Sequence, residues 1–327
     1  MKKRKKNELL TLVAIMAATL LLMWCLNPVR FLRVSNIQSM AFQLPELGFL
    51  SIAMMVTMIT GGINLSIVST ANLSGIVAAL VMHSAQASGG QDASPLLVVC
   101  LAIAAALAAS ALVGLVNGFL IAVVEVPAIL ATLGMMTLLN GVSILLTKGY
   151  VISDFPEGFR AIGNGLLSGV PVPIIVFAAA VVLVALLLSR SAFGFELYMI
   201  GTNPTATLYA GVNNRRVLIK TYLLSGIMCG FAAIIMISRF NSAKSDYGAS
   251  YLLVTVLAAV LGGVSVSGGF GRVTGLVLSL AILQLLSSGL NLLQANAFLT
   301  RAIWGIVLIL VMVINNFSAI AGGRRKS

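Results

Sequence analysis

The sequence predicts an all-α integral membrane protein of about ten transmembrane helices, with both termini in the cytoplasm and a single transmembrane domain over residues 1–327. Of its residues, 60% are hydrophobic and only 9% are charged. Soluble domains carry about 25% charged residues, so this chain lacks the polar residues to cover a water-facing surface. Most of its apolar runs are about 16 to 22 residues long and continuous, which fits helices crossing a core of about 30 Å and not the alternating strands of a barrel.

Ten apolar runs are expected to cross the bilayer. They cover residues 9–27, 39–60, 66–82, 96–124, 128–147, 171–189, 218–238, 252–267, 273–292 and 299–316. The first run follows a basic tail, residues 1–8, and so imitates a signal peptide. Because it is longer than a typical signal-peptide core and lacks a small-residue cleavage pattern, we interpret it as an uncleaved first span.

The distribution of basic residues supports an orientation with both termini in the cytoplasm. Ten spans with a cytoplasmic amino terminus place 13 of the 20 Lys and Arg residues inside, in the tail 1–8, the loop 190–217 with the adjoining Lys220, the tail 317–327 and the short turn before residue 273. Arg30 and Arg33 run against the rule and leave the sidedness of the first hairpin open. The net charge of +12 therefore indicates a multi-pass protein among the lipids of a bacterial inner membrane, and no nucleic-acid partner is expected.

The sequence has little with which to do chemistry. It contains no phosphate-binding loop, zinc-protease motif or serine-hydrolase elbow, and only eight acidic residues and one histidine. Cys25, Cys100 and Cys229 lie in apolar runs without metal-ligand spacing, and His83 ends a span beside a polar loop. We therefore predict no catalytic residue, no metal site and no cofactor bound by this chain. An intramembrane enzyme would have to use Glu46 or His83.

Two glycine-rich interruptions echo one another along the chain. One reads Gly-Gly-Ile-Asn-Leu-Ser over residues 61–66, and the other reads Gly-Gly-Val-Ser-Val-Ser over residues 262–267. Paired interruptions in two halves of a membrane protein are a pointer to a transport path. The alternative is that these glycines only permit close helix packing. The candidate path residues are Gly61, Gly62, Asn64, Ser66, Gly262, Gly263 and Ser265, together with Glu46.

Glu46, just after Pro45, is the clear intramembrane charge. Such a carboxylate marks ion-coupled transport, but it can equally lie near a wet helix end or be hydrogen-bonded internally. Because only one intramembrane carboxylate is a clear candidate, the sequence argues against a proton-driven pump. Hydroxyl and amide side chains suit a neutral polyhydroxylated solute, because they donate and accept hydrogen bonds without burying net charge, although Ser and Thr also join transmembrane helices.

The long inside loop is predicted to contain a short helix over residues 203–210. Asn203 is a good helix cap, Pro204 suits the first helical position, and Gly211 suits the left-handed residue that follows a helix. This helix is either an ordinary interfacial connector or a rigid element on which a cytoplasmic partner docks.

Four segments resemble the permease subunits of ribose-, xylose- and arabinose-type ABC importers. Residues 201–213, GTNPTATLYAGVN, resemble the cytoplasmic loop of that family, and residues 60–66, TGGINLS, are similar to its GGIDLS signature. Residues 258–275 and 289–293 are similar to its glycine-rich segment and its NGLNLL run. Asn64 stands where the family usually has Asp, and Glu46 is extra to its commonest pattern.

The resemblance implies an ABC-importer permease fold and a non-catalytic translocation subunit. It also implies three protein partners: a cytoplasmic ATPase that uses ATP and Mg²⁺, a periplasmic sugar-binding protein, and a second permease copy or a sister permease. Helix 203–210 would be the ATPase-coupling helix. The positions that carry over are Gly201, Asn203, Pro204, Ala206, Ala210 and Gly211.

We therefore expect ATP-driven import of a monosaccharide or similar neutral polyol delivered by the periplasmic protein. The alternative is a secondary transporter of a small polar solute driven by an ion gradient. The sequence leaves open which sugar is carried and whether the permease pair is a homodimer or a heterodimer.

Overall fold

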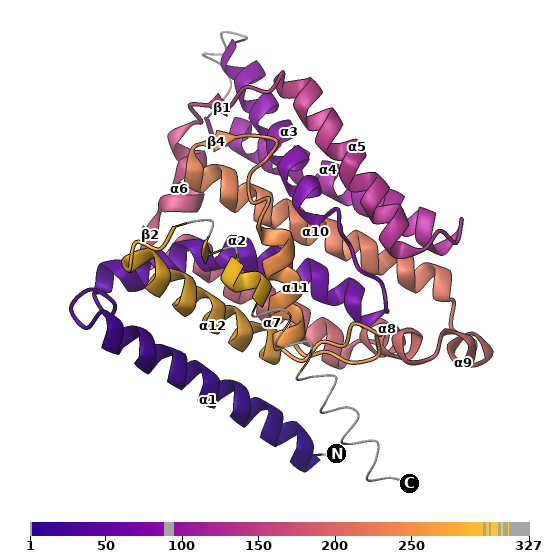
Figure 1. Cartoon of the computed structure of the whole chain (residues 1–327). Helices are drawn as coiled ribbons and strands as arrows, with labels where there is room; N and C mark the ends of the chain where they lie inside the picture. The colour runs from indigo at the N-terminus through magenta and orange to yellow at the C-terminus, as the bar shows by residue number, and fades with distance from the viewer. Residues whose placement is uncertain are drawn as a thin grey trace.

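The computed structural model describes residues 2–87 and 95–296, together with residues 299–300, 302–306, 309 and 313. Within these residues the fold is helical, with four two-residue strands (Figure 1). The helices are α1 (Lys2–Leu26), α2 (Val34–Ile59), α3 (Ile67–Ala87), α4 (Pro95–Ala122), α5 (Ala128–Thr147), α6 (Glu157–Asn164), α7 (Val172–Arg190), α8 (Ala192–Thr202), α9 (Pro204–Tyr209), α10 (Asn214–Phe240), α11 (Tyr251–Leu261) and α12 (Val273–Leu292). The strands are β1 (Ile152–Ser153), β2 (Leu166–Leu167), β3 (Val170–Pro171) and β4 (Ser242–Ala243).

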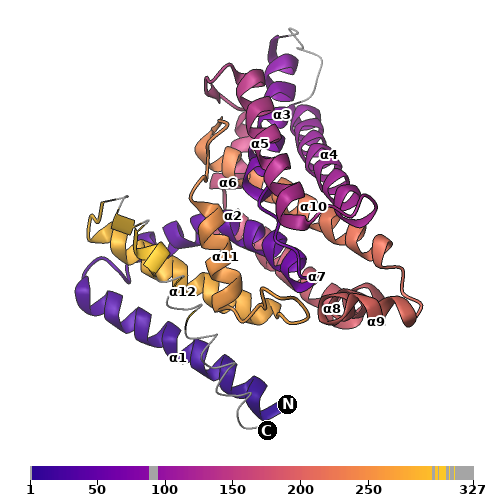
Figure 2. The same cartoon turned by 45° about the vertical axis from the view of Figure 1, so that its right-hand side comes forward.

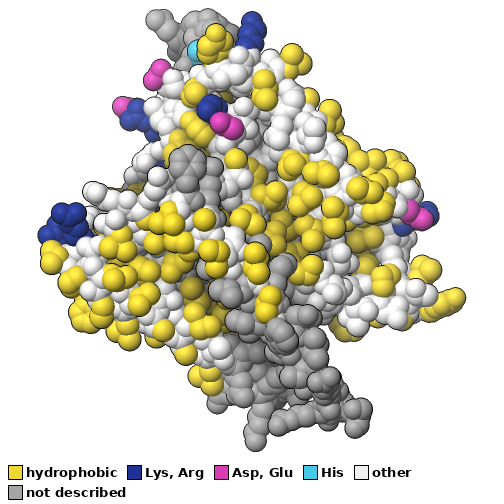
Figure 3. All heavy atoms as spheres, in the orientation of Figure 1, with side chains coloured by type: hydrophobic (Ala, Val, Ile, Leu, Met, Phe, Trp, Pro, Cys, Tyr) yellow, Lys and Arg dark blue, Asp and Glu magenta, His cyan; other side chains and the backbone are white. Residues whose placement is uncertain are grey.

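Eight helices in the described part of the chain are long and apolar enough to cross a membrane: α1, α2, α3, α4, α5, α7, α10 and α12. They account for the first seven predicted spans and for the span at residues 273–292. Hydrophobic side chains spread over the face seen in Figure 3, and charged side chains gather toward its margins. Such a continuous apolar surface is typical of contact with lipid.

The ninth predicted span, residues 252–267, is shorter than expected. Its helix α11 has 11 residues and ends at Leu261, which corresponds to about 16 Å, or half of a bilayer core. The helix ends because Gly263 adopts a left-handed conformation with φ of +81°. The expected span is therefore a half-length helix followed by a glycine-rich loop. Half of the tenth predicted span, 299–316, lies outside the described residues.

The centre of the molecule is α2. From Pro45 to Ile59 each of its residues is buried, so it is surrounded by protein on all sides. It packs against α10, α11, α12 and α7, and α1 lies outermost against α12 (Figures 1 and 2). Helix α10 also packs closely along α4, where Gly114 and Gly226 bring the two backbones together. Small residues permit this close approach in membrane helices.

The strands tie loops together on one side of the bundle. β1 pairs with β4 in antiparallel register, with Ile152 opposite Ala243. β2 and β3 form a hairpin whose turn residues, Ser168 and Gly169, both have positive φ, as a two-residue hairpin turn requires. The pairing of β1 with β4 joins the loop after α5 to the loop after α10.

Candidate functional site

The predicted short helix in the long loop is present as α9. The Asn203 side-chain oxygen accepts a hydrogen bond from Ala206 N at 3.0 Å, and Pro204 is the first helical residue. Gly211 follows with φ of +81°. Both ends are therefore terminated as the sequence predicts. The tip carries exposed apolar side chains, with Tyr209 87% and Leu208 60% exposed.

Helix α8 precedes α9, and sequence reasoning missed it. The Ser191 hydroxyl accepts a hydrogen bond from Gly194 N at 3.0 Å and starts the helix. A local signal for this cap was available, because serine is a preferred N-cap residue. Burial raises the pKa of the Tyr198 hydroxyl, which therefore stays protonated and donates to Gly271 O at 2.7 Å. Helix α8 is thereby bonded to the second glycine-rich loop.

The end of α8 lies against the end of α2, where the first glycine-rich interruption begins, and against the loop that contains the second. A Cβ on Gly201 would collide with Ile59 O, at the end of α2, and with Gly269 N. Gly269 N in turn donates a hydrogen bond to Ile59 O at 2.8 Å. A Cβ on Gly268 would lie 2.8 Å from both Gly201 O and Gly61 N. We call these five residues, Ile59, Gly61, Gly201, Gly268 and Gly269, the glycine junction.

The remaining predicted glycines and Ser265 support this junction without joining it. Gly62 lies against the Tyr222 hydroxyl, and Gly262 packs on the backbone of Leu276 in α12. Gly263 makes the left-handed turn after α11. Ser265 N donates to Phe270 O at 2.9 Å, which closes the loop on itself.

Asn64 and Ser66 form a buried hydrogen-bonded group rather than lining an open channel. Asn64 Oδ1 accepts from Ser66 N at 3.1 Å and from Ser66 Oγ at 2.8 Å. Asn64 Nδ2 donates to Ser225 Oγ at 3.1 Å, while the Ser225 hydroxyl donates to Ala53 O at 3.0 Å. Because the Ser225 hydroxyl already donates its proton to Ala53 O, the side chain at position 64 must donate a hydrogen bond to Ser225 Oγ. This geometry accounts for Asn where an Asp is usual.

Two buried polar atoms near this group lack a partner among the described residues. They are the Tyr222 hydroxyl, beside Gly62, and Asn117 Oδ1, whose amide nitrogen donates to Ser66 Oγ at 2.9 Å. A buried polar group without a partner is costly. The first interruption therefore has unused hydrogen-bonding capacity, which a water molecule or a polar solute would satisfy.

Glu46 lies near the opposite end of the buried part of α2, about 20 Å along the helix from Ile59. It is 1% exposed and forms a two-point ion pair with Arg239 of α10, with Oε1–Nη2 2.7 Å and Oε2–Nε 3.3 Å. The Tyr251 hydroxyl of α11 donates to Glu46 Oε1 at 2.6 Å. We call Glu46, Arg239 and Tyr251 the ion-pair cluster. Of the open alternatives for Glu46, the structure shows internal hydrogen bonding.

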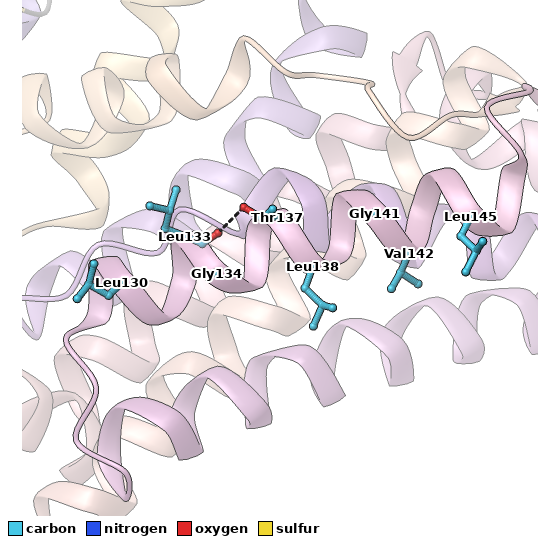
Figure 4. A pocket seen from close by; sticks show the side chains of 8 residues that line it. All are labelled: Leu130, Leu133, Gly134, Thr137, Leu138, Gly141, Val142 and Leu145. Atoms are coloured by element: carbon cyan, nitrogen blue, oxygen red, sulfur yellow. Dashed lines mark hydrogen bonds between the residues drawn. The ribbon is translucent and has the colours of Figure 1, made fainter.

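An open apolar groove of about 750 Å³ runs along α5 (Figure 4). Its lining side chains are mostly leucines such as Leu138 and Leu145, which are 59% and 76% exposed. The Thr137 hydroxyl bonds within the helix, to Leu133 O at 3.0 Å. The groove thus presents no converging polar groups, and it suits lipid or another helix rather than a polar solute.

Comparison with known proteins identifies relatives of the chain. Residues 36–312 match the model of a family described as the permease component of the branched-chain amino acid transport system. The ribose import permease protein RbsC of Escherichia coli K12 is 32% identical over 320 residues, which cover 97% of this chain and 94% of that protein. RbsC of Bacillus subtilis is 34% identical over 89% of this chain and 87% of its own length. The autoinducer 2 import system permease protein LsrD of Yersinia enterocolitica is 33% identical over 83% of this chain and 81% of its own length. No solved structure matches the chain.

Proposed function

The chain belongs to this family of permease components, and we propose that it is the membrane subunit of an ATP-driven importer of a monosaccharide or similar neutral polyol. As a member of the family it is a non-catalytic transport subunit and a multi-pass protein of the inner membrane. The proposed partners are a cytoplasmic ATPase that uses ATP and Mg²⁺, a periplasmic sugar-binding protein, and a second permease copy or a sister permease.

The observation that carries the proposal is the contact of α8 with the end of α2, where the first glycine-rich interruption begins, and with the loop that contains the second. Helix α9 projects from the bundle (Figures 1 and 2). Between it and α8 lies a mostly apolar recess of about 310 Å³, lined by residues that include Phe195 and Ala206. Exposed apolar groups such as Phe195, 67% exposed, suit a protein partner. We assign this surface to the ATPase, with α9 as the coupling helix.

Movement of this surface has a direct route into the membrane. Gly201, the next-to-last residue of α8, touches the end of α2 and the loop after α11 through backbone atoms. Backbone atoms in tight contact cannot change rotamer, so a displacement of α8 must move these neighbours. ATP hydrolysis at the partner would then switch the path between outward and inward access.

The solute class follows from the relatives and from the charges. The names of the relatives specify ribose and autoinducer 2, whereas the family description specifies branched-chain amino acids. An amino acid carries two charges that the path would have to pair. Glu46 and Arg239 already neutralise each other, so this pair offers no free charge to a zwitterion. We therefore favour a neutral polyol.

Transport in reconstituted vesicles tests the energy source. With the ATPase and the binding protein present, uptake of radiolabelled ribose, xylose, galactose or mannitol should require ATP for at least one solute. The permease alone under an imposed pH gradient should give none. Uptake driven by the gradient without any ATPase would overturn the proposal in favour of the ion-driven alternative.

The coupling role of α9 has its own test. Ala206→Pro removes the N–H that Asn203 caps, at a cost of about 1 kcal/mol to this helix. Hydrolysis of ATP should continue while solute uptake falls at least tenfold, because the docking helix is distorted and the spans are untouched. Ala206→Ser keeps the N–H and serves as the control. Normal uptake by the proline variant would rule out this role for α9.

A further inference from the structure

A second polar region lies at the far end of α2 from the glycine junction. It is a cavity of about 290 Å³ between α2, α11, α12 and the residues Ala295, Thr300 and Trp304. Twelve described residues line it. Six carry an amide or an aliphatic hydroxyl group, two are aromatic and four are aliphatic. Its volume lies near the lower end of the range of about 300 to 1,000 Å³ typical of small-molecule sites.

The lining combines the groups that bind a sugar ring. The amides of Gln43, Gln284 and Asn291 can each donate and accept, as vicinal hydroxyl groups require. Tyr251 and Trp304 supply ring faces on which the C–H face of a sugar can pack, with polar atoms at their edges. None of the twelve lining residues is charged, so the cavity offers no partner for the carboxylate or ammonium group of an amino acid.

These side chains are held in place before any solute enters. Gln284 is 7% and Trp304 is 6% exposed. The Tyr251 hydroxyl is bonded to Glu46 at 2.6 Å, so the ion-pair cluster sets the orientation of this ring at the cavity wall. Gln284 Nε2 reaches Gln43 Oε1 only at 3.4 Å, a long and weak hydrogen bond. Hydroxyl groups of a bound solute could replace it at little cost.

The cavity and the coupling helix lie at opposite ends of the same elements. Gln43 is 16 residues before Ile59 on α2, or about 24 Å along the helix. Helix α12 likewise begins close to the loop of the glycine junction, and its Asn291 lies at the cavity. If α9 meets the ATPase in the cytoplasm, the cavity therefore lies toward the periplasm, where a binding protein would deliver its solute.

We infer that this cavity binds one cyclic sugar through Gln43, Gln284, Asn291 and the rings of Tyr251 and Trp304, and that it is the entry site of the transport path. The sugar class and the entry role rest on the proposed function, whereas the presence of a binding site here does not. In this site Trp304 packs on the ring and the amides bind the hydroxyl groups.

The two tryptophans of the chain, Trp24 and Trp304, allow a direct measurement. In a Trp24→Phe variant Trp304 is the sole tryptophan, and its emission reports on the cavity. Titration of the purified chain in lipid nanodiscs with ribose, xylose and galactose should give a saturable change in Trp304 emission for at least one sugar. Leucine, as the amino acid probe, should give none. A Trp304→Phe variant, which retains Trp24 in the outer helix α1, should not respond.

Two glutamines of α2 form a matched pair for testing the site. In the Trp24→Phe background, Gln43→Ala should raise the Kd for the responding sugar at least tenfold. Gln38→Ala should leave the Kd unchanged, because Gln38 does not line the cavity and instead donates to Gly169 O at 3.3 Å. The site is overturned if no sugar changes Trp304 emission, if leucine does, or if both glutamine variants bind alike.

Uptake by the full complex separates this inference from the proposed function. ATP-dependent uptake with a KM at least tenfold higher in Gln43→Ala than in Gln38→Ala supports both. ATP-dependent uptake with equal KM values overturns the entry site and leaves the ABC permease intact. Saturable sugar binding without ATP-dependent uptake overturns the proposed function and leaves the cavity as a sugar site.

Discussion

The two ends of the buried part of α2 are held by opposite kinds of contact. At the ion-pair cluster, charged and hydroxyl side chains from α10 and α11 meet Glu46 at 2.6–3.3 Å. At the glycine junction, backbone atoms of α8 and of the loop after α11 meet Ile59. Separating a buried ion pair leaves an uncompensated charge, whereas glycine backbones can shift against one another without doing so. We therefore expect α2 to be anchored near Glu46 and displaceable near Ile59.

The largest expected effect tests the anchored end. Glu46→Ala leaves Arg239 largely buried without its carboxylate, which should lower the free energy of unfolding by about 3 to 5 kcal/mol. Thermal unfolding in detergent, followed by circular dichroism, would measure the loss. The double variant Glu46→Ala/Arg239→Ala should be more stable than Glu46→Ala alone. If the single and the double variant unfold at the same temperature, the ion pair does not anchor α2.

A smaller effect on stability, but a large one on transport, is expected at the displaceable end. Gly201→Ala inserts a methyl group against Ile59 O and Gly269 N, which should cost about 1 to 3 kcal/mol and reduce ATP-dependent uptake at least tenfold. Gly134→Ala is the matched control, since the added Cβ on α5 would meet nothing within 4 Å. Equal uptake by the two variants would contradict a transmitting role for the junction.

The smallest effect is expected beside the junction, at Asn64. Asn64→Asp replaces the amide donor to Ser225 with an acceptor and should cost about 1 kcal/mol, the net value of one hydrogen bond. Adding Ser225→Ala removes the second acceptor and should restore part of this loss in the same unfolding measurement. A stabilising effect of Asp alone would refute our account of why Asn occupies this position.

Sequence reasoning was most accurate where the signal is local. The family resemblance is confirmed by the match over residues 36–312, and the caps of α9 lie where Asn203, Pro204 and Gly211 place them. It was least accurate for residues 252–267. There the apolar run continues beyond Leu261, while the backbone turns at the following glycines. Because mean hydropathy is averaged over a window of residues, it does not detect such a turn, and the half-length helix α11 was predicted as a full span. The roles of the path and coupling residues stay predictions.

From the sequence alone the chain is recognisable as a helical membrane protein of this family, and the bounds of α9 are predictable. These properties depend on residues that are close together in the chain. The pairing of Glu46 with Arg239 and Tyr251, which are 193 and 205 residues away, is visible only in the folded chain. Folding also brings Gly61 against the loop after α11, and Gly201 against that loop and the end of α2. Local patterns do not specify such partners, because they result from how α2, α8, α10 and α11 pack together.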